Sequence, residues 1–195
     1  MRNREYHNIK AIFNREILTT FNSPMALIFF FVFAATSSYF FTSPFFVIGQ
    51  SDLRGLFSII PLLYLILIPA ITMSMISRDW NLGTMEIMTT LPITDYEYVL
   101  GKFFSAITLV ITSLSFTIVH VITIYRFGTE IDTGAIICGY FGLILLGAFY
   151  SSIGIFASSL TDNQVYALLL SFGIVLLFFM MDKVLIFVPS ATLSG

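Results

Sequence analysis

The side chains that most often perform catalysis or hold metals are few in this chain and stand far apart. It has one cysteine, Cys138, and two histidines, His7 and His120. None of them has the spacing of a metal site, and a single cysteine excludes an intrachain disulfide. The pattern G-x-x-x-x-G-K-[ST] of a phosphate-binding loop does not occur in the sequence. We therefore predict no catalytic residue, no metal and no cofactor in this chain, and expect Cys138 to act as a small buried apolar residue.

A polar segment at residues 77–98 has the composition of a structured loop and is the best candidate for acting on a partner. Gly83 permits a turn, Thr84 can cap a following helix, and Glu86 would lie in the favourable first turn of that helix. Pro92 discourages helix at the residue before it. The segment predicts a short helix with apolar side chains available for contact, although a plain turn at the membrane interface fits the same residues.

The end of this segment contains a helix start signal. Thr94 and Glu97 fit a capping box, in which each side chain accepts a hydrogen bond from the other residue's backbone N–H. A long helix is therefore expected to begin near Asp95.

Hydroxyl groups and one histidine lie within the apolar stretch that follows. Thr108, Thr112 and Ser115 share one helical stripe, and His120 lies on the adjacent face. Such hydroxyls can bond carbonyls of their own helix, join neighbouring helices or line a substrate path. His120 fits either a neutral, hydrogen-bonded histidine near the outer interface or a pathway residue.

Small residues form a second pattern, at steps of four, three and four. They are Gly147, Ser151, Gly154 and Ser158. A face of this kind lets another helix approach closely, within the same chain or in a dimer.

The elements that position these residues are long and apolar. The chain is 57% hydrophobic, 16% aromatic and only 10% charged, with a mean hydropathy of +0.95. Five blocks can each cross about 30 Å of hydrocarbon as a helix. They are 25–48, 56–76, 103–125, 135–160 and 165–181. The fold class predicted is an all-α, polytopic membrane helix bundle in contact with membrane lipids, and the net charge of −2 gives no field that would bind nucleic acid.

Residues 1–22 differ from the rest, which we treat as one transmembrane domain of residues 23–195. Apolar side chains recur there at steps of three and four, as in a helix that lies in the membrane interface. Ser23 and Pro24 then predict the cap and first turn of a new helix.

Lysine and arginine counts predict the orientation. Six lie in the N-terminal segment and the 77–102 loop, namely Arg2, Arg4, Lys10, Arg15, Arg78 and Lys102. Three lie on the opposite side, namely Arg54, Arg126 and Lys183. The excess places the N-terminus and residues 77–98 in the cytoplasm.

Motifs spread along the chain resemble the permease family of type 2 ATP-binding-cassette (ABC) exporters, and most closely its gliding-motility-associated branch. They are Arg15-Glu16, Ser23-Pro24, residues 68–73, Gly83-Thr84-Met85-Glu86, Leu91-Pro92-Ile93-Thr94, Leu100-Gly101-Lys102, Gly139-Tyr140, Gly142, Ile153-Gly154 and residues 158–164. The family usually has an acidic pair where this chain has Arg78-Asp79.

The resemblance implies a multi-pass permease in the bacterial cytoplasmic (inner) membrane that dimerises with a second copy or a paralogue. Its partner would be a separate ABC-type ATPase that binds ATP and Mg²⁺. The coupling segment would comprise Arg78, Asp79, Gly83, Thr84, Glu86 and Pro92. The family has six spans, and the 14 residues after the fifth predicted span are too few for a sixth.

Three classes of function can be weighed against these residues. The leading one is the transmembrane permease subunit of an ATP-driven exporter. The alternative is a non-transporting membrane anchor or assembly subunit of an ATPase-linked envelope complex, which the sequence barely excludes. An intramembrane enzyme is disfavoured because the predicted spans hold no paired acids and no catalytic pair.

Overall fold

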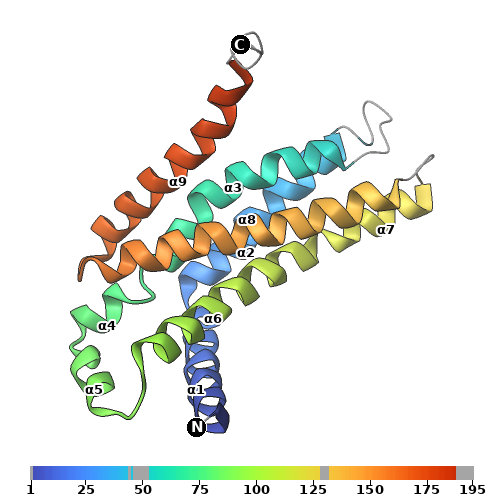
Figure 1. The fold of residues 1–195 in the computed structure, drawn as a ribbon. Coiled ribbons are helices and arrows are strands. Elements are labelled where there is room, and N and C mark those ends of the chain that lie inside the picture. Colours follow the sequence, from blue (N-terminus) through green and yellow to red (C-terminus); the bar gives the residue numbers. More distant parts are fainter. Residues whose placement is uncertain (1, 44, 46–52, 128–131, 188–195) are drawn as a thin grey trace, which may run out of the picture.

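The computed structural model describes residues 2–43, 45, 53–127 and 132–187, and its regular elements there are all helices. Figure 1 shows their arrangement. They are α1 (Arg2–Phe21), α2 (Pro24–Thr42), α3 (Arg54–Thr72), α4 (Ser77–Asn81), α5 (Thr84–Thr90), α6 (Asp95–Phe116), α7 (Ile118–Phe127), α8 (Thr133–Ser159) and α9 (Gln164–Phe187).

Among the residues that the structure describes, five helical segments are long and apolar enough to cross a membrane. They are Pro24–Thr42, Arg54–Asn81, Asp95–Phe127, Thr133–Ser159 and Gln164–Met181. This confirms the predicted all-α bundle with five spans. The first span was expected to reach residue 48, but residues 44 and 46–48 lie outside the described part of the chain.

One end of the bundle, which we call the base, gathers α1, α4, α5 and the turn between α8 and α9 (Figure 1). There α1 lies crosswise to the spans and packs against α6. The buried residues of α1 include Ile12 and Glu16, and the location of this helix in the membrane interface stays a prediction. Of the apolar residues that recur at steps of three and four, Ile9, Phe13 and Ile17 are half-buried and Tyr6 is exposed, so the stripe read from sequence overlaps the face that packs against the bundle.

The predicted helix starts are confirmed where local chemistry determines them. The Ser23 hydroxyl accepts a hydrogen bond from the backbone N–H of Ala26, and Pro24 occupies the first turn of α2. At α6 both bonds of the capping box are present, since Thr94 N donates to Glu97 Oε2 (2.9 Å) and Glu97 N donates to Thr94 Oγ1 (3.3 Å).

The third predicted span is present as Asp95–Phe127, and its helix is interrupted at Thr117 between α6 and α7. The backbone N–H and the hydroxyl of Thr117 both donate to the Leu114 carbonyl, and the hydroxyl also contacts Tyr140 Oη at 2.7 Å. A bond of this local type competes with the regular helical ladder.

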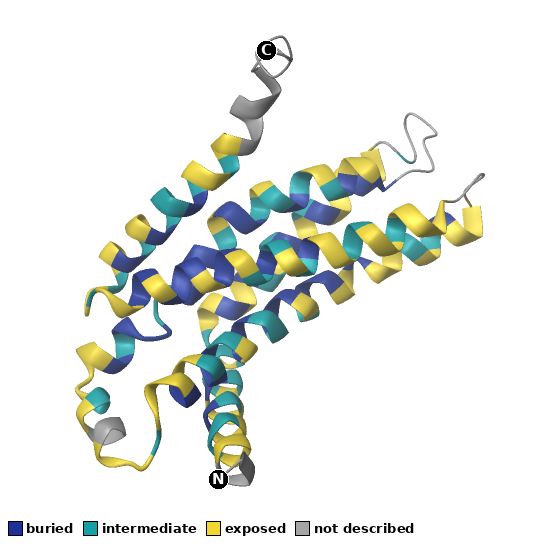
Figure 2. Cartoon of the chain, viewed as in Figure 1, coloured by how far each residue is buried: buried dark blue, intermediate teal, exposed yellow. Residues whose placement is uncertain are grey.

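Buried residues concentrate along the inner faces of α3, α6 and α8, while the outer faces carry exposed apolar side chains (Figure 2). One apolar cluster runs through the bundle, with Tyr64, Ile60 and Leu114 in it. A second cluster at the base joins α1 to α3 and α6 through Ile12, Ile71 and Leu109. Exposed apolar faces are what lipid covers in a membrane protein.

Candidate functional site

The central feature of the base is a buried lysine held between two carboxylates. Lys102 of α6 places its Nζ 3.0 Å from Glu16 Oε2 of α1 and 2.9 Å from Asp79 Oδ2 of α4. The side chains of Lys102, Glu16 and Asp79 are only 2%, 6% and 5% exposed. We call these three residues the base cluster.

Every hydrogen of the Lys102 ammonium has an acceptor. Besides the two carboxylates, Nζ donates to the backbone carbonyl of Met75, which lies between α3 and α4. The ammonium also lies 4.9 Å from the centre of the Tyr98 ring. A buried charge is tolerated when all its polar bonds are satisfied, and this one ties α1, α4 and α6 to one point.

Asp79 is shared by four side chains. Its Oδ2 accepts hydrogen bonds from Tyr98 Oη (2.6 Å) and Lys102, and its Oδ1 accepts one from Thr84 Oγ1 (3.0 Å). Arg15 Nη2 lies 3.7 Å from Oδ1, with half of its side chain exposed. The carboxylate of Asp79 therefore joins α4 to the start of α5, to α6 and to α1.

Close approach of α1 to α6 is possible because α6 carries Gly101 at the contact. A Cβ there would lie 2.6 Å from Ile12 Cγ2. Nearby, Asn8 Nδ2 donates to Glu97 Oε2 (3.3 Å) and to the Pro92 carbonyl (3.4 Å). The capping box of α6 is thus also a docking point for α1.

The turn between α3 and α4 is held from the other side by α8. Ser158 Oγ accepts hydrogen bonds from the backbone N–H groups of Ile76 and Ser77, each at 3.0 Å, and donates to the Met73 carbonyl at 2.8 Å. One hydroxyl therefore provides the acceptor for two buried N–H groups at the helix ends and a second donor to the Met73 carbonyl, which also accepts a hydrogen bond from the Ser77 hydroxyl.

The residues predicted to couple to a partner lie in three different surroundings. Asp79 is buried in the base cluster, and the hydroxyl of Thr84, for which the sequence suggested a capping role, donates to Asp79. Gly83, Glu86 and Pro92 are exposed, and Gly83 has a φ of 68°, a conformation that favours glycine. Arg78 is half-buried on the side facing α2 and α9.

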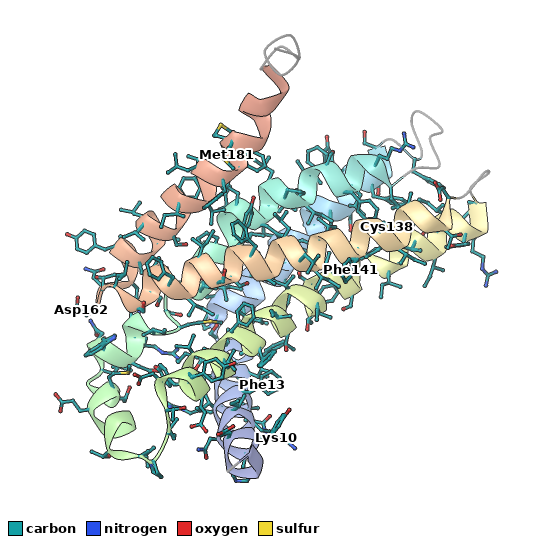
Figure 3. All side chains as sticks on the ribbon, viewed as in Figure 1. Lys10, Phe13, Cys138, Phe141, Asp162 and Met181 are labelled. Carbon is teal, nitrogen blue, oxygen red and sulfur yellow. The ribbon has the colours of Figure 1, made fainter. Side chains whose placement is uncertain are left out.

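The small-residue face of α8 packs within the same chain. Gly147 abuts Val110 of α6 and Tyr64 of α3, and Gly154 abuts Thr72 of α3. Ser151 and Ser158 are buried as well. Cys138 of the same helix is exposed, which corrects the expectation of a buried cysteine; it lies toward the end opposite the base (Figure 3).

The predicted pathway residues do not come together. Thr108, Thr112 and Ser115 donate to carbonyls of their own helix at 2.6–2.8 Å and are half-buried or exposed. His120 is buried against α2 instead, with Nε2 3.2 Å from Ser38 Oγ and its ring 4.6 Å from that of Phe41.

Sequence reasoning did not select Glu16, Tyr98 and Lys102 as site residues, although motifs containing Glu16 and Lys102 carried the resemblance. One signal was available. Glu16 is the last charge before the first apolar block, Lys102 is the last before the third, and Asp79 is the first acid after the second. Charges that adjoin spans on one side of the membrane must lie at the same depth, where pairing is favoured.

The fold and its base define a polytopic helical membrane protein whose described residues include no group of three or more His, Cys, Asp or Glu that could hold a metal. A family model described as ABC-2 family transporter protein matches residues 8–194, so the chain belongs to that family and is a membrane permease component of an ABC transporter. The match does not support assignment to the gliding-motility-associated branch. No curated protein and no solved structure matches the chain.

Proposed function

We propose that this chain forms the translocation pathway of an ATP-driven exporter in the bacterial cytoplasmic membrane, with its N-terminus in the cytoplasm, and that a separate ATPase drives it through the base. The observation that carries the proposal is the base cluster, because Lys102 joins the interfacial helix α1, the loop helix α4 and the spanning helix α6 at one buried point. Family membership supports an ABC ATPase as the partner, which would bind ATP and Mg²⁺.

The surface available to that ATPase is the exposed side of α4 and α5. Trp80, Leu82 and Leu91 are large apolar side chains exposed there, with Gly83 and Glu86 beside them. We call these five residues the docking surface. Exposed aromatic and apolar side chains with a polar rim are typical of protein interfaces.

Movement imposed on the docking surface would reach the spans through short, satisfied contacts. Asp79 lies one residue before Trp80, and its carboxylate is bonded to Lys102 and Tyr98 of α6. The same lysine holds α1, so the push would act on α1, α4 and α6 together. A pair of buried ions resists separation because either charge left alone is costly.

A second copy or a paralogue would complete the pathway. The small-residue face of α8 is already occupied within the chain, whereas the hydroxyl stripe of α6 is half-buried or exposed. A second permease placed against that stripe would give a path lined by Thr108, Thr112 and Ser115.

Co-purification with a co-expressed cassette ATPase tests the coupling assignment. Replacing Gly83 to Glu86 by a Ser-Ala linker of equal length is expected to abolish co-purification. Arg126→Gln, at the end of the bundle opposite the base (the far end), is expected to leave co-purification intact. Association that survives the loop replacement would sink the assignment.

Transport of a labelled candidate substrate into inverted vesicles separates the permease from the alternative, a membrane anchor or assembly subunit. We expect uptake that needs ATP, the partner ATPase and an intact Lys102. An anchor would bind the ATPase with no uptake of any substrate offered, and the family match does not favour it.

A further inference from the structure

A hollow of about 190 Å³ lies at the base, and Arg78 of α4 is among the residues that line it. It is bounded by the end of α1, the start of α2, the end of α3, α4 and the start of α9. These are the points where the crosswise helix α1 gives way to the first span and where two other spans begin or end (Figure 1). The hollow therefore lies at the depth of the membrane surface.

Arg78 carries the only formal charge among the residues that line the hollow in the described structure. Thr20, Ser23, Ser74 and Gln164 provide polar groups, while Met25, Ile71 and Met73 provide an apolar side. A cation, several uncharged polar groups and an apolar wall form the combination that suits an anionic head attached to hydrocarbon.

The charge of Arg78 is not compensated within the described part of the chain. Its neighbour Asp79 belongs to the base cluster, where Lys102 and the adjoining, half-exposed Arg15 balance the carboxylates of Asp79 and Glu16. No hydrogen bond or ion pair joins the Arg78 guanidinium to any residue that the structure describes. The Asp79 carboxylate thus has cationic partners, whereas the guanidinium of its neighbour Arg78 has no anionic partner among the described residues.

We propose that this hollow binds the phosphate group of an anionic membrane phospholipid, with Arg78 as its ionic partner. A guanidinium matches phosphate oxygens in pairs, and basic pockets between spans at the membrane surface are suited to lipid head groups. The hydroxyls of Thr20 and Ser74 and the amide of Gln164 lie around the same space and can complete the polar shell. The apolar wall of Met25, Ile71 and Met73 would meet the first part of the acyl chains.

This site is independent of the coupling role proposed above. A bound lipid would fix the joint between α1 and α2 against α4 and α9, whichever partner acts on the docking surface. The hydroxyl of Ser23 already caps the N-terminus of α2, so that helix end does not need a lipid group as a cap.

Native mass spectrometry of the purified full-length chain tests the proposal. The chain is released from detergent that contains either phosphatidylglycerol or phosphatidylcholine with the same acyl chains. The matched variants are Arg78→Gln, Arg78→Lys and Arg126→Gln, the last removing an exposed arginine at the opposite end of the bundle. We expect phosphatidylglycerol to be retained over phosphatidylcholine, and Arg78→Gln to weaken that retention about fivefold, the effect of one basic residue at a membrane surface.

Arg78→Lys should keep most of the retention because it keeps the charge, and Arg126→Gln should leave it unchanged. Equal retention by Arg78→Gln and the unaltered chain, or an equal loss in Arg126→Gln, would overturn the proposal. Displacement of the lipid by millimolar inorganic phosphate would overturn the lipid as occupant, because free phosphate would then account for the site.

Discussion

The two ends of the bundle are held by different interactions. At the base, two carboxylates and a lysine are buried with Tyr98 and the Met75 carbonyl around them. At the far end, His120 makes one side-chain hydrogen bond, to Ser38 at 3.2 Å, and otherwise packs against the Phe41 ring. Buried charges demand one geometry, whereas apolar contacts are non-directional and can rearrange at lower cost. The base is thus suited to transmit a push, and the far end to change its packing.

The same contrast appears at two glycines of α8. At Gly154, near the base, an added Cβ would lie 1.9 Å from Thr72 Oγ1, and that hydroxyl is bonded to the Ile68 carbonyl at 2.8 Å. At Gly139, near the far end, the Cβ would meet the rim of the Phe57 ring at 2.4 Å. The half-buried ring of Phe57 can swing away, but a β-branched threonine with a bonded hydroxyl has little freedom.

The largest expected effect comes from Lys102→Met, which leaves Glu16 and Asp79 buried without their shared cation. Removing one partner of a buried ion pair costs about 3–5 kcal/mol of folding free energy. Denaturant unfolding in detergent measures the loss, with Lys10→Met as control because Lys10 is exposed on α1 (Figure 3). Equal stability of the two variants would show that the base cluster contributes nothing.

The second-largest loss of stability is expected at Gly154, and it should exceed the loss at Gly139. Gly154→Ala is expected to cost about 1–3 kcal/mol, the usual range for overpacking a close contact. Gly139→Ala should cost less because Phe57 yields, and Gly142→Ala, where nothing lies within 4 Å, should be neutral or slightly stabilising. Thermal unfolding of the three variants ranks them, and a larger loss at Gly139 than at Gly154 would reverse the comparison.

The smallest effect is expected at the far end. Ser38→Ala removes the hydrogen bond to His120 and should cost about 0.5–1.5 kcal/mol, the range for one ordinary bond. Tyr98→Phe is the matched change at the base, since it removes a bond to a carboxylate, and should cost about 1.5–3 kcal/mol. If Ser38→Ala proves the more damaging of the two, the far end is the more tightly held region.

The sequence predicted those features that depend on local chemistry. Long apolar runs require helices in a membrane, and the caps at Ser23 and Thr94 need only neighbouring residues. The burial of Glu16 could not be predicted in this way, because its partner Lys102 is 86 residues away. The break at Thr117, where the hydroxyl donates to the Leu114 carbonyl and contacts Tyr140 of another helix, was not read from the apolar pattern, and the exposure of Cys138 could not be read from a stretch that is apolar on every side.

The candidate site was predicted in part. Segment 77–98 was selected correctly as a structured loop, with Gly83 at its turn. The sequence does not show which way the charged side chains of this segment point, so Arg78 and Asp79 were both assigned to the coupling segment. In the structure Arg78 lines the hollow, whereas Asp79 lies inside the base cluster. Neighbouring residues on a short helix face different ways, and only the packing of α1 and α6 shows which side is buried.

We infer that α1 and α4 are held together through Lys102 and move as one unit. Spin labels at Asn14 of α1 and Asn81 of α4, both exposed, in a Cys138→Ala background allow their separation to be measured by electron spin resonance. We predict one narrow distance distribution that does not change when the partner ATPase binds ATP, and a broad or split one in Lys102→Met. A distribution that shifts with ATP in the unaltered base, or that stays narrow in Lys102→Met, would contradict the account.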